Sequence, residues 1–385
     1  MELKKIHISD IGKIVTGKTP RTSIVENYGG NIPFLTPSDD LSYKSVPKTS
    51  KTLTEQGLNE VKNCLLPPHS VCVSCIGSDL GKVVMTLEPT ITNQQFNSII
   101  PNRQFNADFV YYLMTLVGKE LNYLSKTSTA VPIINKSSFS NYEVEVPDLK
   151  KQEKIASILS SLDDKIELNR RINGNLEQQA QALYAKAFSS TNTCKMGDVV
   201  ETTSGGTPSR KNQNYFSSQG IKWIKSKELN GSFIFDSEEH ISNDGLCNSS
   251  AKLLPPNSTL IAMYGATVGA YGLTIDNATC NQAICALLPN SQYPYTYLYM
   301  WAKNNKDELI QKAIGSAQQN ISQIIIKNMP VANEKDKIIR FDSDTRYIFS
   351  LMRSLAKENY NLIALRDALL PRLMSGELKF NDLNR

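Results

Sequence analysis

The segment from Gly12 to Thr19 has the residue types and spacing of a phosphate-binding loop. Gly12, Gly17, Lys18 and Thr19 satisfy the pattern in which backbone N–H groups and a lysine surround nucleotide phosphates at the start of a helix. However, Pro20 follows directly, and no apolar strand ending in aspartate is present to hold magnesium. We therefore expect no nucleotide binding. An enzyme that uses this loop stays an alternative, which a nucleotide-binding assay would test.

Four side chains near residue 70 offer the nitrogen and sulfur ligands that zinc prefers, namely Cys64, His69, Cys72 and Cys75. A related segment lies 188 residues later in the chain. It places Lys252, Asn257, Leu260 and Met263 at the corresponding positions. Because apolar residues replace the last two cysteines there, we expect buried thiols and no metal site.

The other candidates for catalysis lack partners of the right kind. Asp148 with Asp163, Asp164 and Lys165 has the composition of a nuclease site, but the last three lie in a helical pattern where a nuclease needs a strand. The three histidines have no matching serine and carboxylate pattern of a hydrolase. We expect a protein with no catalytic residues and no cofactor.

The composition is that of a folded protein with more than one core. Of the 385 residues 40% are apolar, and a chain of this length usually divides into two or more domains. A net charge of +5 is compatible with a polyanionic partner but does not identify one. The sequence has no long apolar run, no signal-peptide pattern and only seven scattered cysteines. We expect a cytoplasmic protein with reduced thiols and no membrane segment.

An internal repeat organises the chain. Leu65-Leu66-Pro67-Pro68 recurs 188 residues later as Leu253-Leu254-Pro255-Pro256, and 12 of the 38 positions that begin there are identical without a gap. The shared positions include paired glycines, Asn93-Gln94 and Asn281-Gln282. Each copy begins with short apolar runs between Gly, Pro and Asn, which predicts strands and turns. The chain is one unit duplicated.

Each copy ends in a long helical pattern. From Gln152 to Phe188, and again from Ile348 to Leu373, apolar residues recur at three- and four-residue spacing. A helix over residues 152–188 would be roughly 55 Å long and could not bury its apolar stripe alone. We expect the two helices to pack antiparallel on each other. The asparagines expected at this seam, unless they face solvent, are Asn169, Asn173 and Asn359.

These patterns predict a mixed α/β (α+β) fold in which two related globular domains are separated by two long antiparallel helices that form a coiled-coil spacer. The predicted parts are residues 1–147, 148–189, 190–330 and 331–385. Two globules held apart by a rigid spacer can contact two half-sites on DNA. Because the copies differ at most polar positions, we expect an asymmetric, bipartite target.

Two segments carry a resemblance to a known family. The run from Gln152 to Asn169 resembles the central spacer helix of type I restriction-modification specificity subunits, and the run from Leu369 to Leu378 resembles their closing signature. The resemblance covers nearly the whole chain, in the order target-recognition domain, helix, target-recognition domain, helix. It implies a non-catalytic subunit that binds double-stranded DNA. It also implies two adenine methyltransferase subunits and ATP-dependent restriction subunits as partners.

Residues that are identical in both copies cannot easily read two different base sequences, so we expect them to be turn, packing or phosphate-contacting elements. Polar residues that differ between the copies are the expected base readers. The expected DNA-contacting residues are Thr19, Arg21, Thr22, Ser23 and Lys44 in the first copy, and Thr207, Ser209, Arg210, Lys211, Asn212, Lys225, Lys227, Gln318 and Gln319 in the second.

The two helices are the expected docking sites for the partner subunits. The residues expected to contribute are Ile155, Leu162, Ile166, Leu176, Leu183, Leu351, Leu355, Leu362 and Leu369. The alternative is a protein-interaction scaffold without sequence-specific DNA readout. Salt-dependent affinity for duplex DNA would distinguish the two, because phosphate contacts release counterions.

Overall fold

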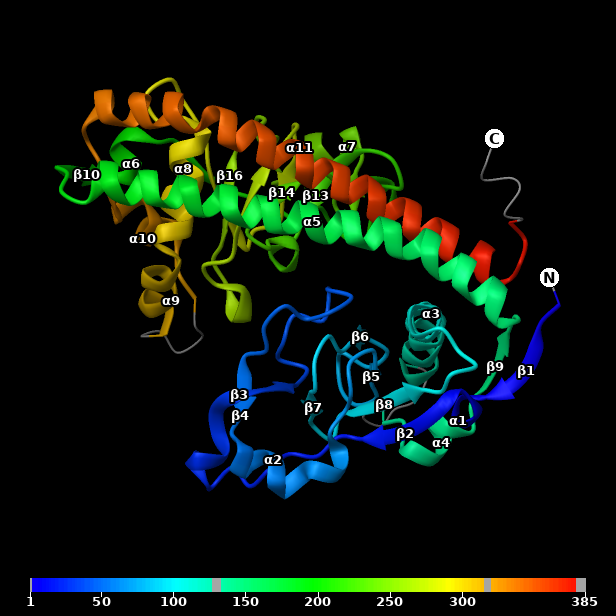
Figure 1. The fold of residues 1–385 in the computed structure, drawn as a ribbon. Helices are drawn as coiled ribbons and strands as arrows, with labels where there is room; N and C mark the ends of the chain where they lie inside the picture. Colours follow the sequence, from blue (N-terminus) through cyan, green and yellow to red (C-terminus); the bar gives the residue numbers. More distant parts are fainter. Residues whose placement is uncertain (1, 127–132, 315–319, 379–385) are drawn as a thin grey trace. The chain divides into compact units, whose positions relative to one another are not determined.

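Two long helices run through both halves of the structure, α5 (Leu149–Phe188) and α11 (Lys335–Met374) (Figure 1). The computed structural model describes residues 2–126, 133–314 and 320–378. The chain divides into unit 1, residues 1–167 with 362–385, and unit 2, residues 168–361. Each long helix therefore gives one part of its length to each unit.

Unit 1 is built on a four-stranded sheet in the order β2-β8-β5-β6 and a three-stranded sheet in the order β4-β3-β7. A separate pair joins β1 to β9 in antiparallel register. The strands are β1 (Lys4–His7), β2 (Gly12–Thr16), β3 (Tyr28–Leu35), β4 (Lys51–Leu53), β5 (Val71–Ser74), β6 (Val83–Met85), β7 (Ile91–Thr92), β8 (Phe96–Pro101) and β9 (Glu143–Val146).

Short helices and one long helix complete unit 1. They are α1 (Ile8–Ile11), η1 (Val25–Asn27), α2 (Glu55–Val61), η2 (Lys62–Cys64), α3 (Ala107–Lys126) and α4 (Lys136–Ser140). The central strand β5 is buried along its whole length, and α3 packs its apolar face on β5 and β6. The apolar run that predicts a strand here therefore forms the middle of the core.

Unit 2 repeats this arrangement with one added strand in each of its two sheets. Its larger sheet has the order β11-β19-β16-β17-β14, its smaller sheet β12-β15-β13-β18, and β10 pairs with β20. The strands are β10 (Thr193–Lys195), β11 (Thr202–Ser204), β12 (Phe216–Ser217), β13 (Ile221–Ile224), β14 (Phe233–Ile234), β15 (His240–Ile241), β16 (Thr259–Ala262), β17 (Tyr271–Thr274), β18 (Thr279–Cys280), β19 (Ile284–Leu287) and β20 (Pro330–Ala332).

The helices of unit 2 also follow the order of unit 1. They are α6 (Met196–Val199), η3 (Gln213–Tyr215), η4 (Ser226–Glu228), α7 (Asn243–Cys247), η5 (Gly265–Thr267), α8 (Tyr295–Asn304), α9 (Lys306–Ile314) and α10 (Gln323–Asn328). Even the rare parallel pair is repeated, since β3 pairs parallel with β7 and β13 with β18. The predicted duplication is confirmed at the level of strand order.

One backbone feature shows how closely the copies agree. His69 and Asn257 are the non-glycine residues with positive φ in the described ranges, at 65° and 63°, and they occupy the same position of the repeat. Histidine and asparagine tolerate this left-handed conformation better than most residues. His69 therefore serves the turn before β5, which explains its presence beside three cysteines without a metal.

In unit 1, α5 and α11 meet through an apolar core and a buried ion pair. Ile155 and Leu159 pack with Leu370 and Leu373 in one cluster. Next to it, the buried carboxylate of Asp163 accepts hydrogen bonds from the Tyr112 hydroxyl, at 2.5 Å, and from Arg366, at 2.7 Å.

In unit 2, the same two helices meet through asparagines and aromatic rings. Asn169 donates from Nδ2 to Asn359 Oδ1 at 2.9 Å, and Asn173 donates to the carbonyl of Met352 at 3.2 Å. Residues further along α5 meet residues earlier in α11, so the helices are antiparallel, as predicted. Asn169 and Asn359 are buried, which places them in the seam and not toward solvent.

Within the described ranges, no helix is both long enough and apolar enough to cross a membrane.

Candidate nucleic-acid interface

A threonine–glutamine hydrogen bond recurs at the same place in both units. Thr19 Oγ1 donates to Gln94 Oε1 at 2.7 Å, and Thr207 Oγ1 donates to Gln282 Oε1. All four residues are identical between the copies, and both glutamines are exposed. Because the single hydroxyl proton of each threonine is used by a glutamine, these threonines cannot also donate to a DNA phosphate. The donors that each Thr–Gln pair can still offer are the amide nitrogens of the exposed Gln94 and Gln282.

A glycine allows each of these hydrogen bonds to form. A Cβ atom on Gly17 would lie 2.1 Å from the carbonyl oxygen of Asn93, and a Cβ atom on Gly205 would lie 2.1 Å from that of Cys280. Real Cβ atoms do not approach backbone oxygen so closely. The two glycines therefore let the segment that carries each threonine pass against the segment that carries its glutamine.

Two predicted arginines are held in place by glutamates. In unit 1, Arg21 donates from Nε at 3.0 Å and from Nη2 at 2.7 Å to the Glu60 carboxylate. In unit 2, Arg210 forms two such bonds to Glu239 and stacks on the Phe216 ring, 4.3 Å from its centre. The hydrogen bonds from the arginines lower the pKa of both carboxyl groups to about 2. Both arginine side chains remain exposed, at 71% for Arg21 and 55% for Arg210.

The glutamates were not found from the sequence, and the repeat offers no signal for them. Glu60 lies on α2, whereas Glu239 directly precedes β15, so the two do not occupy matching positions. Both units therefore contain an arginine–carboxylate pair, but the glutamate comes from a different element in each unit.

Lysines that sequence analysis assigned to DNA contact divide into two groups. Lys225 is only 18% exposed and bonds to Glu238 and Glu239, both at 2.8 Å, which raises its pKa. Lys227 is 60% exposed and bonds to Glu238 at 2.7 Å. Lys225 therefore belongs to an internal ion-pair network, while Lys227 keeps most of its surface open to solvent.

The expected contact of Lys44 with DNA conflicts with its surroundings. Its ammonium group bonds to Asp108 at 2.6 Å and to Ser160 on α5 at 2.9 Å, and it lies over the Tyr111 and Tyr112 rings. The side chain is only 12% exposed. Lys44 ties its loop to the core of unit 1, because a largely buried ammonium is stable only where several acceptors surround it.

The remaining predicted residues are mostly at the surface. Thr22, Ser23, Ser209 and Lys211 are exposed. Asn212 caps η3, since its side-chain oxygen accepts a hydrogen bond from the Asn214 backbone. Gln318 and Gln319 lie outside the described residues.

The phosphate-loop pattern at Gly12–Thr19 does not form a phosphate-binding loop. Gly12–Thr16 is strand β2, paired with β8 along its length. The N–H groups of Gly17 and Lys18 donate to the carbonyls of Phe96 and Thr92. A loop that holds phosphates needs these N–H groups free at the start of a helix, so the nucleotide-binding alternative has no structural support.

The cysteines also lack the surroundings of a metal site. Burial raises the pKa of Cys72 to about 12 and that of Cys75 to about 11, which disfavours the thiolate that zinc requires. Within the described ranges no three or more His, Cys, Asp and Glu side chains are grouped closely enough to hold a metal ion. All seven cysteines are free.

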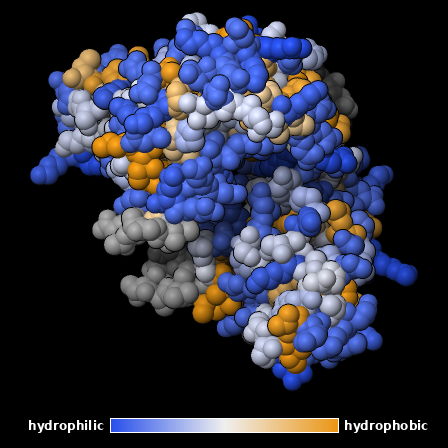
Figure 2. Space-filling view, turned by 90° about the vertical axis from the view of Figure 1, so that its left-hand side faces the viewer, coloured by the Kyte–Doolittle hydropathy of each residue, from blue (hydrophilic) through white to orange (hydrophobic). Residues whose placement is uncertain are grey.

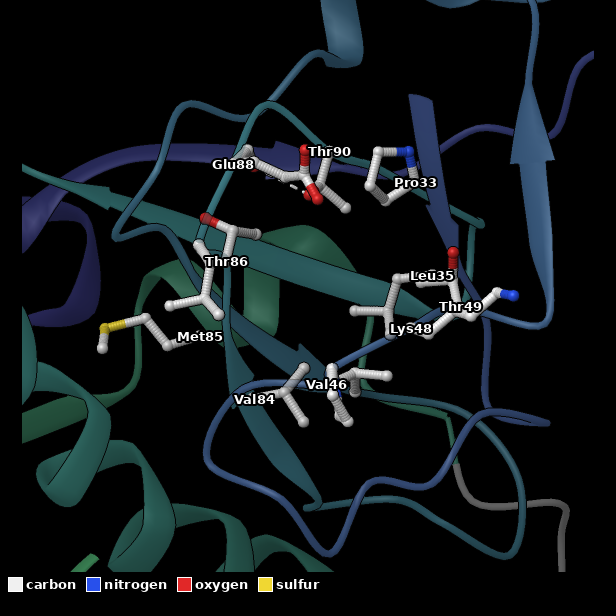
Figure 3. Close-up of a pocket in the computed structure, with 12 residues that line it drawn as sticks. Pro33, Leu35, Val46, Lys48, Thr49, Val84, Met85, Thr86, Glu88 and Thr90 are labelled. Carbon is white, nitrogen blue, oxygen red and sulfur yellow. Dashed lines mark hydrogen bonds between the residues drawn. The ribbon is translucent and has the colours of Figure 1, made fainter. Parts of the chain in front are cut away.

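A small pocket lies between the two sheets of unit 1 (Figure 3). Leu35, Val46 and Val84 line one part of it, and Thr86, Glu88 and Thr90 line another. Its volume is about 70 Å³. Cofactor and substrate pockets are typically several times larger, so this pocket is a packing void of the domain.

Two of the helix residues expected to bind partners are buried inside the protein. Ile155 is 0% and Ile166 2% exposed. The apolar seam that identified these residues is satisfied within the chain, so they are not available to another subunit. Leu183, in contrast, is 37% exposed.

Comparison with known proteins identifies the family. The family described as type I restriction modification DNA specificity domain matches residues 1–178 and 189–339. The type I restriction enzyme MjaIX specificity subunit of Methanocaldococcus jannaschii is 25% identical over 99% of this chain and 94% of that protein. The HindI specificity subunit of Haemophilus influenzae is 36% identical over 43% of this chain and 37% of that protein.

The fold also has a solved relative. The crystal structure of the type I restriction-modification S subunit from M. genitalium aligns with a TM-score of 0.56, at 14% identity, over 97% of this chain and 96% of that one. The predicted fold class, two globular regions with long helices packed together, is confirmed. The chain belongs to the type I restriction-modification specificity family: it is a non-catalytic subunit that recognises the DNA target for methylation and restriction.

Proposed function

We propose that this specificity subunit reads a bipartite, asymmetric target in double-stranded DNA, with unit 1 reading one half-site and unit 2 the other. The observation that carries the proposal is the Thr–Gln hydrogen bond, which recurs in both units while the exposed side chains near it differ. Two related readers need the same support for the backbone. Two different half-sites need different side chains on that support.

The arginines next to these hydrogen bonds are the main candidates for DNA contact. Glu60 and Glu239 fix the planes of Arg21 and Arg210, and the remaining N–H groups can donate to phosphate or to guanine O6 and N7. Gln94 and Gln282 replace the threonines as proposed phosphate donors. The other proposed contacts are Thr22, Ser23, Ser209, Lys211 and Lys227, all exposed.

We further propose that α5 and α11 hold two adenine methyltransferase subunits, and that ATP-dependent restriction subunits join the same complex. Several large apolar side chains on these helices are exposed and would be covered by a partner. They are Leu168 at 43%, Leu183 at 37%, Ile339 at 44%, Tyr347 at 78% and Leu365 at 48%. The predicted residues Leu162, Leu176, Leu351, Leu355, Leu362 and Leu369 are half-buried and would form the margins of such contacts.

The surface pattern agrees with docking through limited patches. On the face shown in Figure 2, apolar residues form small separate groups among polar ones. Partners that bind such a surface depend on a few anchoring side chains and on polar contacts around them. Because its substrate is DNA, we expect this complex to act in the cytoplasm.

The test is a map of methylated adenines in the DNA of cells that express this chain together with its methyltransferase. We expect a single bipartite motif that disappears when the chain is deleted. If the methyltransferase is active and the methylation pattern is the same with and without the chain, the proposal is wrong. Purified chain should also bind duplex DNA with an affinity that falls steeply with salt.

A further inference from the structure

The Thr–Gln hydrogen bond marks the end of the two central strands in each unit. In unit 1, β5 and β8 are paired up to Ser74 and Phe96, and the next residue, Cys75, still donates to the Gln95 carbonyl at 2.7 Å. Residues 93–96 then form a turn, closed by the N–H of Phe96 donating to the Asn93 carbonyl at 3.2 Å. Gln94 thus lies in this turn, and Ile76 directly follows the last residue that bonds across the two strands.

Unit 2 has the same register with a different residue. Strands β16 and β19 pair up to Ala262 and Ile284, and Met263 donates to the Ala283 carbonyl at 2.8 Å. Residues 281–284 form the equivalent turn, closed by the N–H of Ile284 donating to the Asn281 carbonyl at 3.2 Å. Tyr264, which directly follows Met263, is therefore the structural counterpart of Ile76.

A third segment meets these positions in both units. Ile76 forms an isolated bridge with Ile133, and Tyr264 forms the equivalent bridge with Asn320. The next residues continue the pairing in the same way, because Ile134 donates to the Cys75 carbonyl and Ile321 to the Met263 carbonyl, both at 2.9 Å. The backbone around each bridge is thus the same in the two units.

The side chains at these two places are completely different. Unit 1 has two isoleucines, with Ile133 60% exposed. Unit 2 has a tyrosine that is 42% exposed and an asparagine whose Oδ1 accepts a 3.3 Å hydrogen bond from the Gly265 backbone. The turns behind them keep one shape, since Gly77, Gly81, Gly265 and Gly269 all have positive φ.

We propose that Ile76 with Ile133, and Tyr264 with Asn320, are the base-reading pairs of unit 1 and unit 2. This inference rests on the proposed function and names residues that determine its specificity. Each pair forms the equivalent isolated bridge of its unit, held by the same neighbouring backbone bond, and the pairs differ in chemistry, as two different half-sites require. The position of a side chain is fixed by the shared backbone, and its identity selects the base.

The chemistry of the two pairs predicts different preferences. Methyl groups of the isoleucines in unit 1 suit the 5-methyl group of thymine in the major groove. Asn320 can pair with N6 and N7 of adenine, while the ring and hydroxyl of Tyr264 offer an apolar face and a hydrogen-bonding group to a neighbouring base. The isoleucines of unit 1 have no side-chain hydrogen bonds to offer.

The test exchanges the pairs in the complete complex with its methyltransferase and maps adenine methylation. The double variant Tyr264→Ile with Asn320→Ile places the unit 1 pair on unit 2, and Ile76→Tyr with Ile133→Asn does the reverse. Each should lower methylation at the original motif roughly tenfold, and should relax or replace bases in one half-site only. The matched control Ile324→Ser removes another exposed apolar side chain of unit 2, 68% exposed, and should leave the motif unchanged.

The possible outcomes separate the inference from the proposed function. A bipartite motif in wild type that stays the same in both double variants overturns the base-reading pairs alone. A wild-type complex with no motif overturns the proposed function. If a double variant loses all methylation, the single variant Tyr264→Ile decides, because unit 1 already carries isoleucine on the same backbone. Tyr264→Ile must alter the bases recognised in one half-site and leave the other half-site unchanged. An unchanged motif would refute the assignment.

Discussion

Unit 1 and unit 2 share their strand order but close the seam between α5 and α11 with different chemistry. In unit 1 the carboxylate of Asp163 is buried between Tyr112 and Arg366. In unit 2 the seam is built on asparagine instead, with Asn169 bonded to Asn359 and to the carboxylate of Glu358. The two copies have thus kept the strand order on which the backbone hydrogen bonds depend. They differ in the side chains of the seam, where more than one set of partners can satisfy the buried polar groups.

The largest expected effect comes from breaking the charged seam. Arg366→Met leaves the Asp163 carboxylate buried without its cation and should lower the free energy of unfolding by about 3–5 kcal/mol. Asn359→Leu, the matched change in unit 2, removes a neutral acceptor and should cost about 1–3 kcal/mol. Both tryptophans, Trp223 and Trp301, lie in unit 2. Urea unfolding of the whole chain, followed by circular dichroism and by tryptophan fluorescence, therefore assigns each loss to a unit.

If the two seams are separate features, the circular dichroism and tryptophan signals should respond differently to the two variants. Arg366→Met should shift the circular dichroism transition more than the tryptophan transition, and Asn359→Leu should shift the tryptophan transition. Equal shifts of both signals in both variants would mean that the two seams are not separate features.

The second effect concerns the glycines that the two units share. Gly17→Ala and Gly205→Ala each place a Cβ atom 2.1 Å from a backbone oxygen, so each should cost about 1–3 kcal/mol and disturb its own Thr–Gln bond. Affinity for a duplex that carries both half-sites should fall by about tenfold in either variant. If one of the two alanine variants keeps the wild-type stability and DNA affinity, the Thr–Gln bond does not have the same role in both units.

The third effect concerns the arginine–glutamate pairs, which the units built from different elements. Glu60→Gln and Glu239→Gln should each loosen one arginine and weaken DNA binding several-fold. The pKa of each carboxyl lies at about 2, below its ordinary value of 4.5, so each pair stabilises the fold fully above pH 4.5. That contribution is lost as pH falls through about 2.

Acid titration of stability gives the check on this pair. The free energy of unfolding of wild type should exceed that of either glutamine variant by a constant amount above pH 4.5, and this difference should shrink below that pH. A difference that already shrinks near neutral pH would show that another group carries the effect.

The smallest expected effect is a gain. Gly174 lies inside α5 in unit 2, and a Cβ atom there would meet no atom within 4 Å. Gly174→Ala should therefore raise the free energy of unfolding by about 0.5–1 kcal/mol, because alanine favours the helix. Thermal melting of the variant measures this gain, and a loss of stability would mean that α5 is not a regular helix at this point. The variant is also the matched control for the damaging glycine changes.

The sequence predicted the fold well because its strongest signals come from the backbone. The repeated glycines, prolines and apolar runs specify turns and strands, and the three- and four-residue spacing specifies two helices. Asn169 and Asn359 were placed at the seam by the same spacing. The units themselves were less visible, since each combines segments that are distant in the chain.

The site was predicted less completely because side-chain partners depend on contacts between distant segments. Lys44 looked like an exposed cation, yet it bonds to Asp108 and Ser160. Glu60 and Glu239 have no matching positions in the repeat. Ile76 and Tyr264 could have been noticed as unlike residues beside shared glycines, but only the structure shows that they form equivalent bridges with Ile133 and Asn320.

The central claim is that each unit reads its own half-site and that α5 and α11 set the distance between them. The most direct measurement inserts one heptad into α5 after Glu167 and one into α11 after Asn361, where the chain passes between units. The methylation motif is then mapped in the complete complex. Seven residues add roughly 10 Å to a helix, so we predict unchanged half-sites separated by about three more base pairs. Altered bases within a half-site, or an unchanged separation in an active complex, would contradict the account.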